Sequence, residues 1–240
     1  ATGFVGSNLS RDLIEKGHQI IALGSRADYP GQESDSLTYV RADTTQAGDW
    51  QAHVADADAV INLAGRTIFK YWSKSYKQQI YDSRILTTRN LVAALPETGE
   101  TTLISTSAVG YYGHCGDVLL DETHGPGEDF LARVCVDWEQ EALSTAQKSA
   151  RVVVYRFGVV LGDGGALSKM VPAFKLFAGG ALGGGRQWFP WVHIDDILGA
   201  ISFALENREM NGVYNLCAPH NMRQAAFAKE LGRIIQAARP

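Results

Sequence analysis

The sequence predicts an α/β fold built on a parallel, doubly wound sheet. Two observations predict this class. Short apolar runs typical of buried parallel strands alternate with segments whose apolar residues recur at helical spacing. Strands that alternate with helices form right-handed βαβ units, which assemble into a parallel sheet. The 25 glycines among 240 residues are also clustered, chiefly at the start of the chain and at 179–185.

The elements follow one another in the order that such a fold needs. Apolar residues at helical spacing predict a helix over 7–16, and Gly17 stands where a left-handed helix cap belongs. An apolar run at 18–24 then predicts a buried strand. Further strands are expected at 37–40, 59–65, 102–107 and 151–157, with helices over 76–95 and 167–177.

Composition excludes several classes of protein. With 45% apolar and 20% charged residues, the chain can bury a sizeable core, which excludes intrinsic disorder. A net charge of -4 argues against a general nucleic-acid or anionic-membrane partner. No apolar run approaches the roughly 18 residues of a membrane span, and no targeting signal is visible. Three widely spaced cysteines fit the cytoplasm or another reducing compartment, and no metal-ligand spacing occurs.

The first residues match part of a dinucleotide-binding turn. Gly3 and Gly6 open the first helix, where glycines let the backbone approach a pyrophosphate and the helix N-terminus binds its charge. Alone, this partial glycine motif is weak evidence for dinucleotide binding, since a glycine-rich start of a helix occurs in many α/β proteins. The usual pattern has another glycine and an apolar strand upstream, and both would precede Ala1. We therefore expect the sequence to be N-terminally trimmed.

Several ordered motifs together carry a resemblance to a known family. They are Thr-Gly-Phe-Val-Gly at 2–6, Asn-Leu-Ala-Gly at 62–65, Ser-Ala-Val-Gly-Tyr-Tyr-Gly at 107–113, and Trp-Val-His-Ile-Asp-Asp at 191–196. The chain resembles the extended short-chain dehydrogenase/reductase superfamily, and within it the atypical epimerase-family proteins of the nucleoside-diphosphate-sugar-epimerase-like, cell-division-inhibitor-homologue group.

That resemblance implies an NAD(P)-binding Rossmann fold with a small C-terminal substrate lobe. The dinucleotide-binding core would span 1–160 and lack its first strand. The substrate lobe would occupy mainly 161–240, with segments returning to the core, and would be incomplete at its C-terminus. The implied partner is a small-molecule substrate, nucleotide-sugar-like in this group, and a homodimer is left open.

The end of the second expected strand favours NADP(H) as the cofactor. An NAD site usually places a carboxylate there for the ribose 2′-hydroxyl, whereas a basic residue accommodates a 2′-phosphate. Here Ser25 and Arg26 follow the strand, and no acid occurs before Asp28. A serine hydroxyl and an arginine fork can both bind a phosphate. The alternative for Arg26 is an ordinary solvated surface side chain.

The motifs and the resemblance together nominate the cofactor residues. Arg84 would pair with a phosphate or ribose, or form a surface salt bridge. Glu139 would lie near the nicotinamide end, or be an exposed helix acid beside a packed Trp138. Asp43 would contact adenine, or cap a turn. The cofactor-binding candidates are Thr2, Gly3, Phe4, Val5, Gly6, Ser25, Arg26, Leu63, Ala64, Gly65, Gln79, Arg84 and Glu139.

The catalytic pattern departs from the superfamily. Its usual chemistry needs a tyrosine whose phenol is made acidic by a lysine four residues on. No tyrosine here has such a lysine: Phe130 occupies the tyrosine position, and Val134, or Cys135 after a shift of one, the lysine position. Ser107 remains the catalytic candidate, to orient a substrate carbonyl or hydroxyl, unless it only satisfies a backbone group.

The sequence gives less support to three other candidates for a catalytic role. Tyr111 and Tyr112 could replace the lost phenol, but no cation is spaced in the sequence to activate either. Cys135 fits a buried helix thiol better than a reactive one.

The second half is expected to bind the substrate. A glycine-rich loop at 179–185 precedes Arg186 and Trp188, which could hold an anion and a ring, although an ordinary linker is the alternative. Asp195 is interpreted as the N-cap of a helix that begins near Asp196.

Two functional classes remain open on the sequence. In the first, the protein is an NADP(H)-dependent oxidoreductase or nucleotide-sugar epimerase that uses Ser107 with non-standard partners. In the second, it is a catalytically vestigial NADPH sensor or regulatory partner, for example in division. The missing Tyr-Lys pair favours the second class, whereas Ser107 and the loop with Arg186 favour the first.

Overall fold

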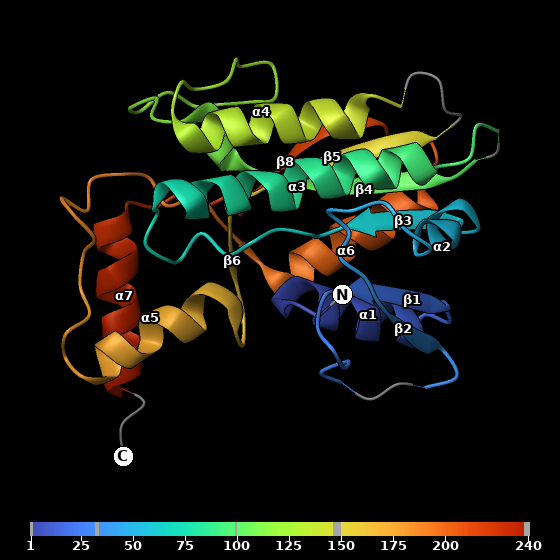
Figure 1. The fold of residues 1–240 in the computed structure, drawn as a ribbon. Helices are drawn as coiled ribbons and strands as arrows, with labels where there is room; N and C mark the ends of the chain where they lie inside the picture. Colours follow the sequence, from blue (N-terminus) through green and yellow to red (C-terminus); the bar gives the residue numbers. More distant parts are fainter. Residues whose placement is uncertain (1, 32–33, 99, 146–149, 238–240) are drawn as a thin grey trace.

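The expected strands and helices form in the computed structural model, which describes residues 2–31, 34–98, 100–145 and 150–237 (Figure 1). Ala1, where the sequence begins, lies outside the described residues. In order, the helices and strands are α1 (Phe4–Glu15), β1 (Ile20–Gly24), β2 (Leu37–Arg41), α2 (Gln51–Ala55), β3 (Ala59–Asn62), α3 (Lys74–Ala94), β4 (Thr102–Ala108), the 3-10 helix η1 (Val109–Tyr112), α4 (Phe130–Leu143), β5 (Arg151–Phe157), β6 (Val159–Leu161), α5 (Gly165–Lys175), β7 (Trp191–His193), α6 (Ile194–Glu206), β8 (Gly212–Leu216) and α7 (Gln224–Ala237).

The strands pair in parallel throughout the named ladders. The largest sheet has the order β3-β4-β5-β8, and β1-β2 and β6-β7 form two short ladders of their own. β1 and β3 do not pair with each other in the part of the chain that the structure describes. The strand expected before Ala1 stays a prediction.

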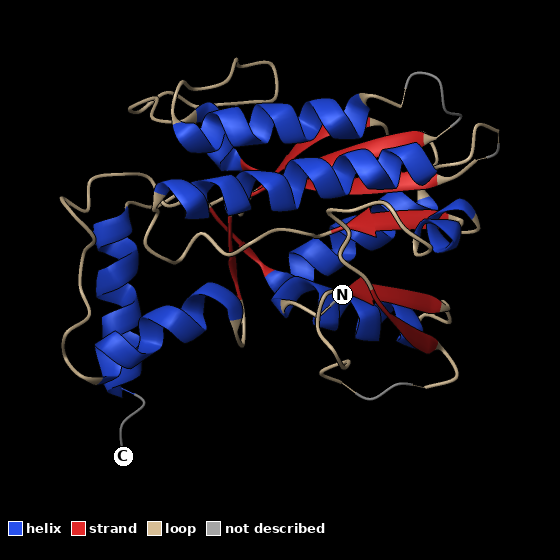
Figure 2. Ribbon diagram, in the orientation of Figure 1, coloured by secondary structure: helices blue, strands red, loops and turns tan. Residues whose placement is uncertain are grey.

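Helices cover both faces of the sheet, which confirms the doubly wound class. α3 and α4 pack side by side over one face, while α1 and α6 pack together over the other (Figures 1 and 2). Neighbouring residues of β4 and β5 face opposite ways. Leu103 and Val152 belong to the cluster under α3, whereas Ile104 and Val153 belong to the cluster with α1 and α6. Both faces of these strands are therefore buried, as their continuous apolar runs predict.

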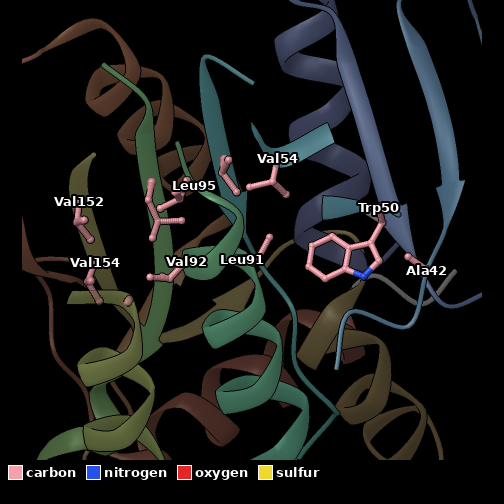
Figure 3. Packing of buried hydrophobic residues seen from close by; sticks show 11 residues of the cluster. Ala42, Trp50, Val54, Leu91, Val92, Leu95, Val152 and Val154 are labelled. Atoms are coloured by element: carbon pink, nitrogen blue, oxygen red, sulfur yellow. The ribbon is translucent and has the colours of Figure 1, made fainter. Parts of the chain in front are cut away.

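The core under α3 shows how the strand ends are held in place. Leu91 and Val92 of α3 and its C-cap Leu95 pack toward Val152 and Val154 of β5 (Figure 3). These side chains are all less than a tenth exposed. Since interiors are close-packed, they fix the height of α3 over the amino-terminal halves of the strands.

Gly17, just after a helix, and Gly199, within one, differ in backbone conformation and therefore in their tolerance of a side chain. Gly17 follows α1 with φ of 87°, whereas Gly199 lies within α6 with an ordinary helical backbone, and neither has an atom within 4 Å of a built Cβ. We expect Gly199→Ala to stabilise the protein by about 0.5–1 kcal/mol, because alanine loses less entropy in a helix. Gly17→Ala is the matched control and should destabilise. Urea unfolding measures both, and equal effects of the same sign would contradict the argument.

The start of α6 corrects one expectation. The helix begins at Ile194, not near Asp196, and its N-cap is His193. His193 Nδ1 accepts a hydrogen bond from the backbone N–H of Asp195 at 3.3 Å. Asp195 is therefore a residue of the first turn, where a carboxylate is favoured by the helix dipole. The cap was missed because histidine is not among the usual N-cap residues.

α5 and α7 form a pair of helices beside the main sheet, whereas α6 and β8, which lie between them in the sequence, belong to the core. α5 packs against α7, at the left of Figure 1. The turn into α5 lies on the first residues of the chain: a Cβ at Gly165, where φ is 53°, would lie 2.5 Å from the Phe4 ring. The proposed boundary near residue 160 stays a prediction. No helix among the described residues is long and apolar enough to cross a membrane.

Candidate functional site

A pocket of about 240 Å³ lies beyond the carboxyl ends of β3 and β4. It collects residues from the start of α1, from the segment after β3, from α3 and from α4. Its lining includes six of the candidates, namely Val5, Leu63, Ala64, Gly65, Arg84 and Ser107. The rest of the lining is mostly apolar. Ligands of doubly wound sheets bind at this edge, so the position agrees with the fold class.

Arg84 is the cation of this pocket. Its guanidinium lies against Gly65, where a Cβ would stand 2.9 Å from Cζ, so any larger residue would displace it. Nη1 donates to the carbonyls of Arg66 and Ile80, each at 3.1 Å. Burial lowers the pKa of the Arg84 guanidinium. No carboxylate of the described residues forms an ion pair with it, so the surface salt bridge is not formed there.

Thr88 holds the helices of the site to the end of β3. Its hydroxyl oxygen accepts hydrogen bonds from Asn62 Nδ2 at 2.8 Å and from Trp138 Nε1 at 2.9 Å. The hydroxyl itself donates to the Arg84 carbonyl at 2.7 Å. The Trp138 ring in turn lies 5.2 Å from the Arg84 guanidinium. One buried hydroxyl therefore ties α3, α4 and β3 together beside the pocket.

Ser107, near the end of β4, forms a hydrogen bond with the buried ion pair of Glu139 and Arg156. Its hydroxyl donates to Glu139 Oε1 at 2.6 Å. Arg156 of β5 donates from Nε to Glu139 Oε1 at 2.9 Å and from Nη2 to Oε2 at 2.7 Å. The two side chains are 4% and 6% exposed. Glu139 is thus not an exposed helix acid: it lies one hydrogen bond away from the pocket, behind Ser107.

The same ion pair reaches the two tyrosines of the 3-10 helix. Arg156 Nη1 donates to the Tyr112 hydroxyl at 2.8 Å, and this hydroxyl donates to Asn215 Oδ1 at 2.8 Å. The Arg156 guanidinium also lies 3.5 Å from the centre of the Tyr111 ring. No cation is spaced in the sequence to accompany these tyrosines, but β5 brings Arg156 to Tyr112 from 44 residues away.

The helix that should carry the Tyr-Lys pair has neither group. Phe130 packs edge-on against Trp72, with ring centres 5.8 Å apart, and does not line the pocket. Val134 and Cys135 both line it. Burial raises the pKa of the Cys135 thiol, partly offset by a hydrogen bond with Ser107. This agrees with a buried, unreactive helix thiol.

The remaining cofactor candidates lie outside the pocket lining. Gly3 is the N-cap of α1 without a side-chain cap, so the first-turn N–H groups receive no bond from it. Ser25 and Arg26 are exposed after β1, and the Arg26 carbonyl accepts a bond from the Tyr39 hydroxyl at 2.9 Å. Gln79 is exposed on α3. Thr2, Phe4 and Gly6 are likewise not among the pocket residues.

Two further candidates have local partners. Asp43 Oδ1 accepts bonds from Thr45, at 3.1 Å from N and 2.7 Å from Oγ1, which is the turn-capping interpretation. Trp188 Nε1 donates to Asp117 Oδ1 at 3.1 Å, and the Arg223 guanidinium lies 3.8 Å from the Trp188 ring centre. The loop before Trp188 is thus joined to the 113–128 segment. Arg186 is exposed.

Arg156 is the site residue that sequence reasoning missed. One signal was present: Arg156, the last but one residue of the strand expected at 151–157, interrupts the apolar run that begins at Val152 and was expected to be buried on both faces. A buried guanidinium requires a counter-charge, so this position predicts an acid nearby. No group of three or more His, Cys, Asp or Glu side chains that could hold a metal occurs among the described residues.

The match to a family model decides the family. Residues 1–217 match the NAD dependent epimerase/dehydratase family. The chain belongs to this family. The expected Rossmann fold and the family resemblance are thereby confirmed, and the nicotinamide class of cofactor is supported.

Relatives cover almost the whole of this family member. The chain is 40% identical, over 98% of its length and 69% of the relative, to the epimerase family protein SDR39U1 homolog, chloroplastic, of Arabidopsis thaliana. It is 37% identical, over its full length and 78% of the relative, to epimerase family protein Mb2239 of Mycobacterium bovis.

A solved structure of a relative has the same fold. The human epimerase family protein SDR39U1 (isoform 2), solved with NADPH, is 31% identical with a TM-score of 0.82. The match covers 98% of this chain and 78% of that one.

Proposed function

We propose that the protein is an NADP(H)-dependent, epimerase-like or oxidoreductase-like member of the family that acts on a small polar substrate. The observation that carries this proposal is the pocket at the ends of β3 and β4. It brings Val5 at the start of α1, the segment 63–65, the Arg84 cation and Ser107 around one cavity. A nicotinamide cofactor supplies hydride transfer when it is bound.

Three features of the chain suit a dinucleotide. The α1 N-terminus has no side-chain cap, and such free N–H groups bind a pyrophosphate. The segment at Gly65 can pass close to a ligand only because it lacks a Cβ. Arg84 is largely buried without a carboxylate partner among the described residues, and a ligand phosphate or ribose would satisfy it.

The choice of NADP(H) over NAD(H) depends on Ser25 and Arg26. Both are exposed where β1 ends, which is where the adenine ribose lies in this fold. The human relative that is 31% identical was solved with NADPH. These two observations support a site for the 2′-phosphate.

Arg26→Ala is expected to weaken NADPH binding about 10-fold to 100-fold, because hydrogen bonds to a charged group contribute roughly 1.5–3 kcal/mol. NADH affinity should stay unchanged, since NADH has no 2′-phosphate. Titration calorimetry with both nucleotides measures the effect. Arg208→Ala, which removes an exposed arginine paired with Glu100 and remote from the Ser25–Arg26 site, is the matched control. Wild-type protein that binds NADH as tightly as NADPH would refute the NADP(H) assignment.

The alternative function is an NADPH-binding sensor or regulatory partner without turnover. Phe130 and Val134 favour it, because neither has a proton to transfer. NADPH oxidation against a panel of carbonyl compounds and nucleotide-sugars separates the two functions. Turnover that disappears in Ser107→Ala supports the enzyme, whereas tight NADPH binding without any turnover supports the sensor.

A further inference from the structure

The pocket is lined by the Ser107 hydroxyl, whose hydrogen is already donated to Glu139. We propose that Ser107 faces the pocket as a hydrogen-bond acceptor, so that the site selects a ligand hydroxyl over a carbonyl. Glu139 and Arg156 act as positioning residues behind it. This inference rests on the proposed function, because it defines the chemical class of ligand that the same pocket binds.

Among the described residues, the Glu139 carboxylate is the acceptor in its hydrogen bonds with Ser107 and Arg156. Arg156 donates to both of its oxygens, and a guanidinium has no acceptor atom. Burial alone would lower the pKa of Arg156, but the hydrogen bond and the negative charge of Glu139 outweigh burial and raise it. A buried guanidinium needs its counter-charge. The carboxyl group is therefore a carboxylate with no proton to give to Ser107.

The single hydrogen of the Ser107 hydroxyl must then point to Glu139. The contact of 2.6 Å is short, as expected for a hydroxyl that donates to a carboxylate. A serine hydroxyl has one hydrogen and two lone pairs. Ser107 therefore offers only lone pairs to the cavity.

The surroundings of Ser107 keep it in this orientation. The neighbouring hydroxyl of Thr106 donates to the Asn62 carbonyl at 3.1 Å and does not compete for Glu139. Burial raises the pKa of the Cys135 thiol beside Ser107, so this neighbour is a neutral thiol, which attracts the serine hydrogen far less than the Glu139 carboxylate does. Ser107 and Glu139 are 3% and 5% exposed, so bulk water has little access to the hydrogen bond between them.

The matching ligand is a hydroxyl on a largely apolar body. Ile68, Leu131 and Phe157 line the cavity and favour apolar carbon atoms. A hydroxyl can donate to Ser107 and also accept from the Arg84 guanidinium, whereas a carbonyl can only accept. The hydroxyl could belong to a substrate alcohol or to a ribose of the cofactor.

Cyclohexanol and cyclohexanone form a matched pair of probes, because they share a ring and differ in this one group. We expect the full chain to bind cyclohexanol about tenfold more tightly, a difference of about 1.4 kcal/mol, as measured by ligand-observed NMR titration. Ser107→Ala should abolish the preference. Ser105→Ala, which removes a buried hydroxyl from the same strand outside the pocket, should retain it.

A second variant tests the positioning residues. The double variant Glu139→Gln with Arg156→Met removes both charges together, so that neither is left buried alone. An amide can donate to Ser107 as well as accept from it, and the serine hydrogen becomes free to face the cavity. The alcohol preference should then fall to about equal affinity or invert. A folded double variant that keeps the wild-type preference overturns the proposal, as does equal binding of both probes by the wild type.

Repeating the titrations with saturating NADPH distinguishes the two sources of the hydroxyl. If cyclohexanol still binds with the same preference, the site serves a substrate alcohol. If NADPH displaces it and Ser107→Ala weakens NADPH binding, the site serves a ribose hydroxyl. Failure of NADPH to bind at all contradicts the proposed function, while the probe preference is measured without the cofactor and is judged separately.

Discussion

Replacing Arg156 by methionine is expected to lower the free energy of unfolding by about 3–5 kcal/mol, because it leaves the Glu139 carboxylate buried without its cation. The two side chains are 4% and 6% exposed, so water cannot take the place of the lost partner. Methionine retains much of the side-chain volume, which limits any contribution from a cavity. Equilibrium urea unfolding, followed by tryptophan fluorescence and circular dichroism, measures the loss.

Arg89→Met is the matched control for Arg156→Met. Arg89 pairs with Glu141, two residues along the same helix from Glu139, but its side chain is 58% exposed. Exposed ion pairs contribute at most about 1 kcal/mol, so this variant should unfold nearly as the wild type does. Similar losses in the two variants would show that burial does not decide the strength of the Glu139–Arg156 pair.

Trp138→Ala should destabilise the protein by about 3–5 kcal/mol and should also weaken NADPH binding. The indole is 5% exposed, lines the pocket, and lies 5.2 Å from the Arg84 guanidinium. Its loss leaves a cavity beside this cation and removes one of the two hydrogen bonds that the Thr88 oxygen accepts, the other coming from Asn62. Urea unfolding and NADPH titration calorimetry report the two effects.

Two other tryptophan variants separate the contributions at Trp138. Trp138→Phe keeps the apolar body but loses the Nε1 bond to Thr88, so a loss of about 1–3 kcal/mol is expected. Trp188→Ala removes an indole that is 42% exposed and should cost far less than Trp138→Ala. If Trp138→Ala bound NADPH as the wild type does, the pocket beside Arg84 could not be the cofactor site.

Local pattern was enough to predict most of the fold. The strand at 102–107 is recognisable because its apolar run is buried on both faces, and the structure places it as β4, the second strand of the main sheet. Gly17 was recognised as a helix end because few other residues adopt its positive φ. Helix starts were less certain: the long helix begins at Lys74, where Ser73 accepts the capping bond, and not at Tyr76.

The connections within the site were not predictable in the same way. Ser107, Glu139 and Arg156 lie on three different elements, and only the parallel register of β4 with β5, which pairs Ser107 with Arg156, brings them together. No spacing in the sequence encodes that register. Glu139 could be named from a resemblance, but its partner could not.

The packing of Phe4 against the turn before α5 has a consequence for how this chain can vary. A Cβ at Gly165 or Gly164 would lie 2.5 or 2.8 Å from the Phe4 ring. A bulkier residue in that turn therefore requires a smaller one at position 4, so substitutions at the two positions depend on each other. We expect these two positions, which are distant in the sequence, to covary among relatives because of this contact. Through it, the first turn of α1 constrains the sequence at the entrance to α5.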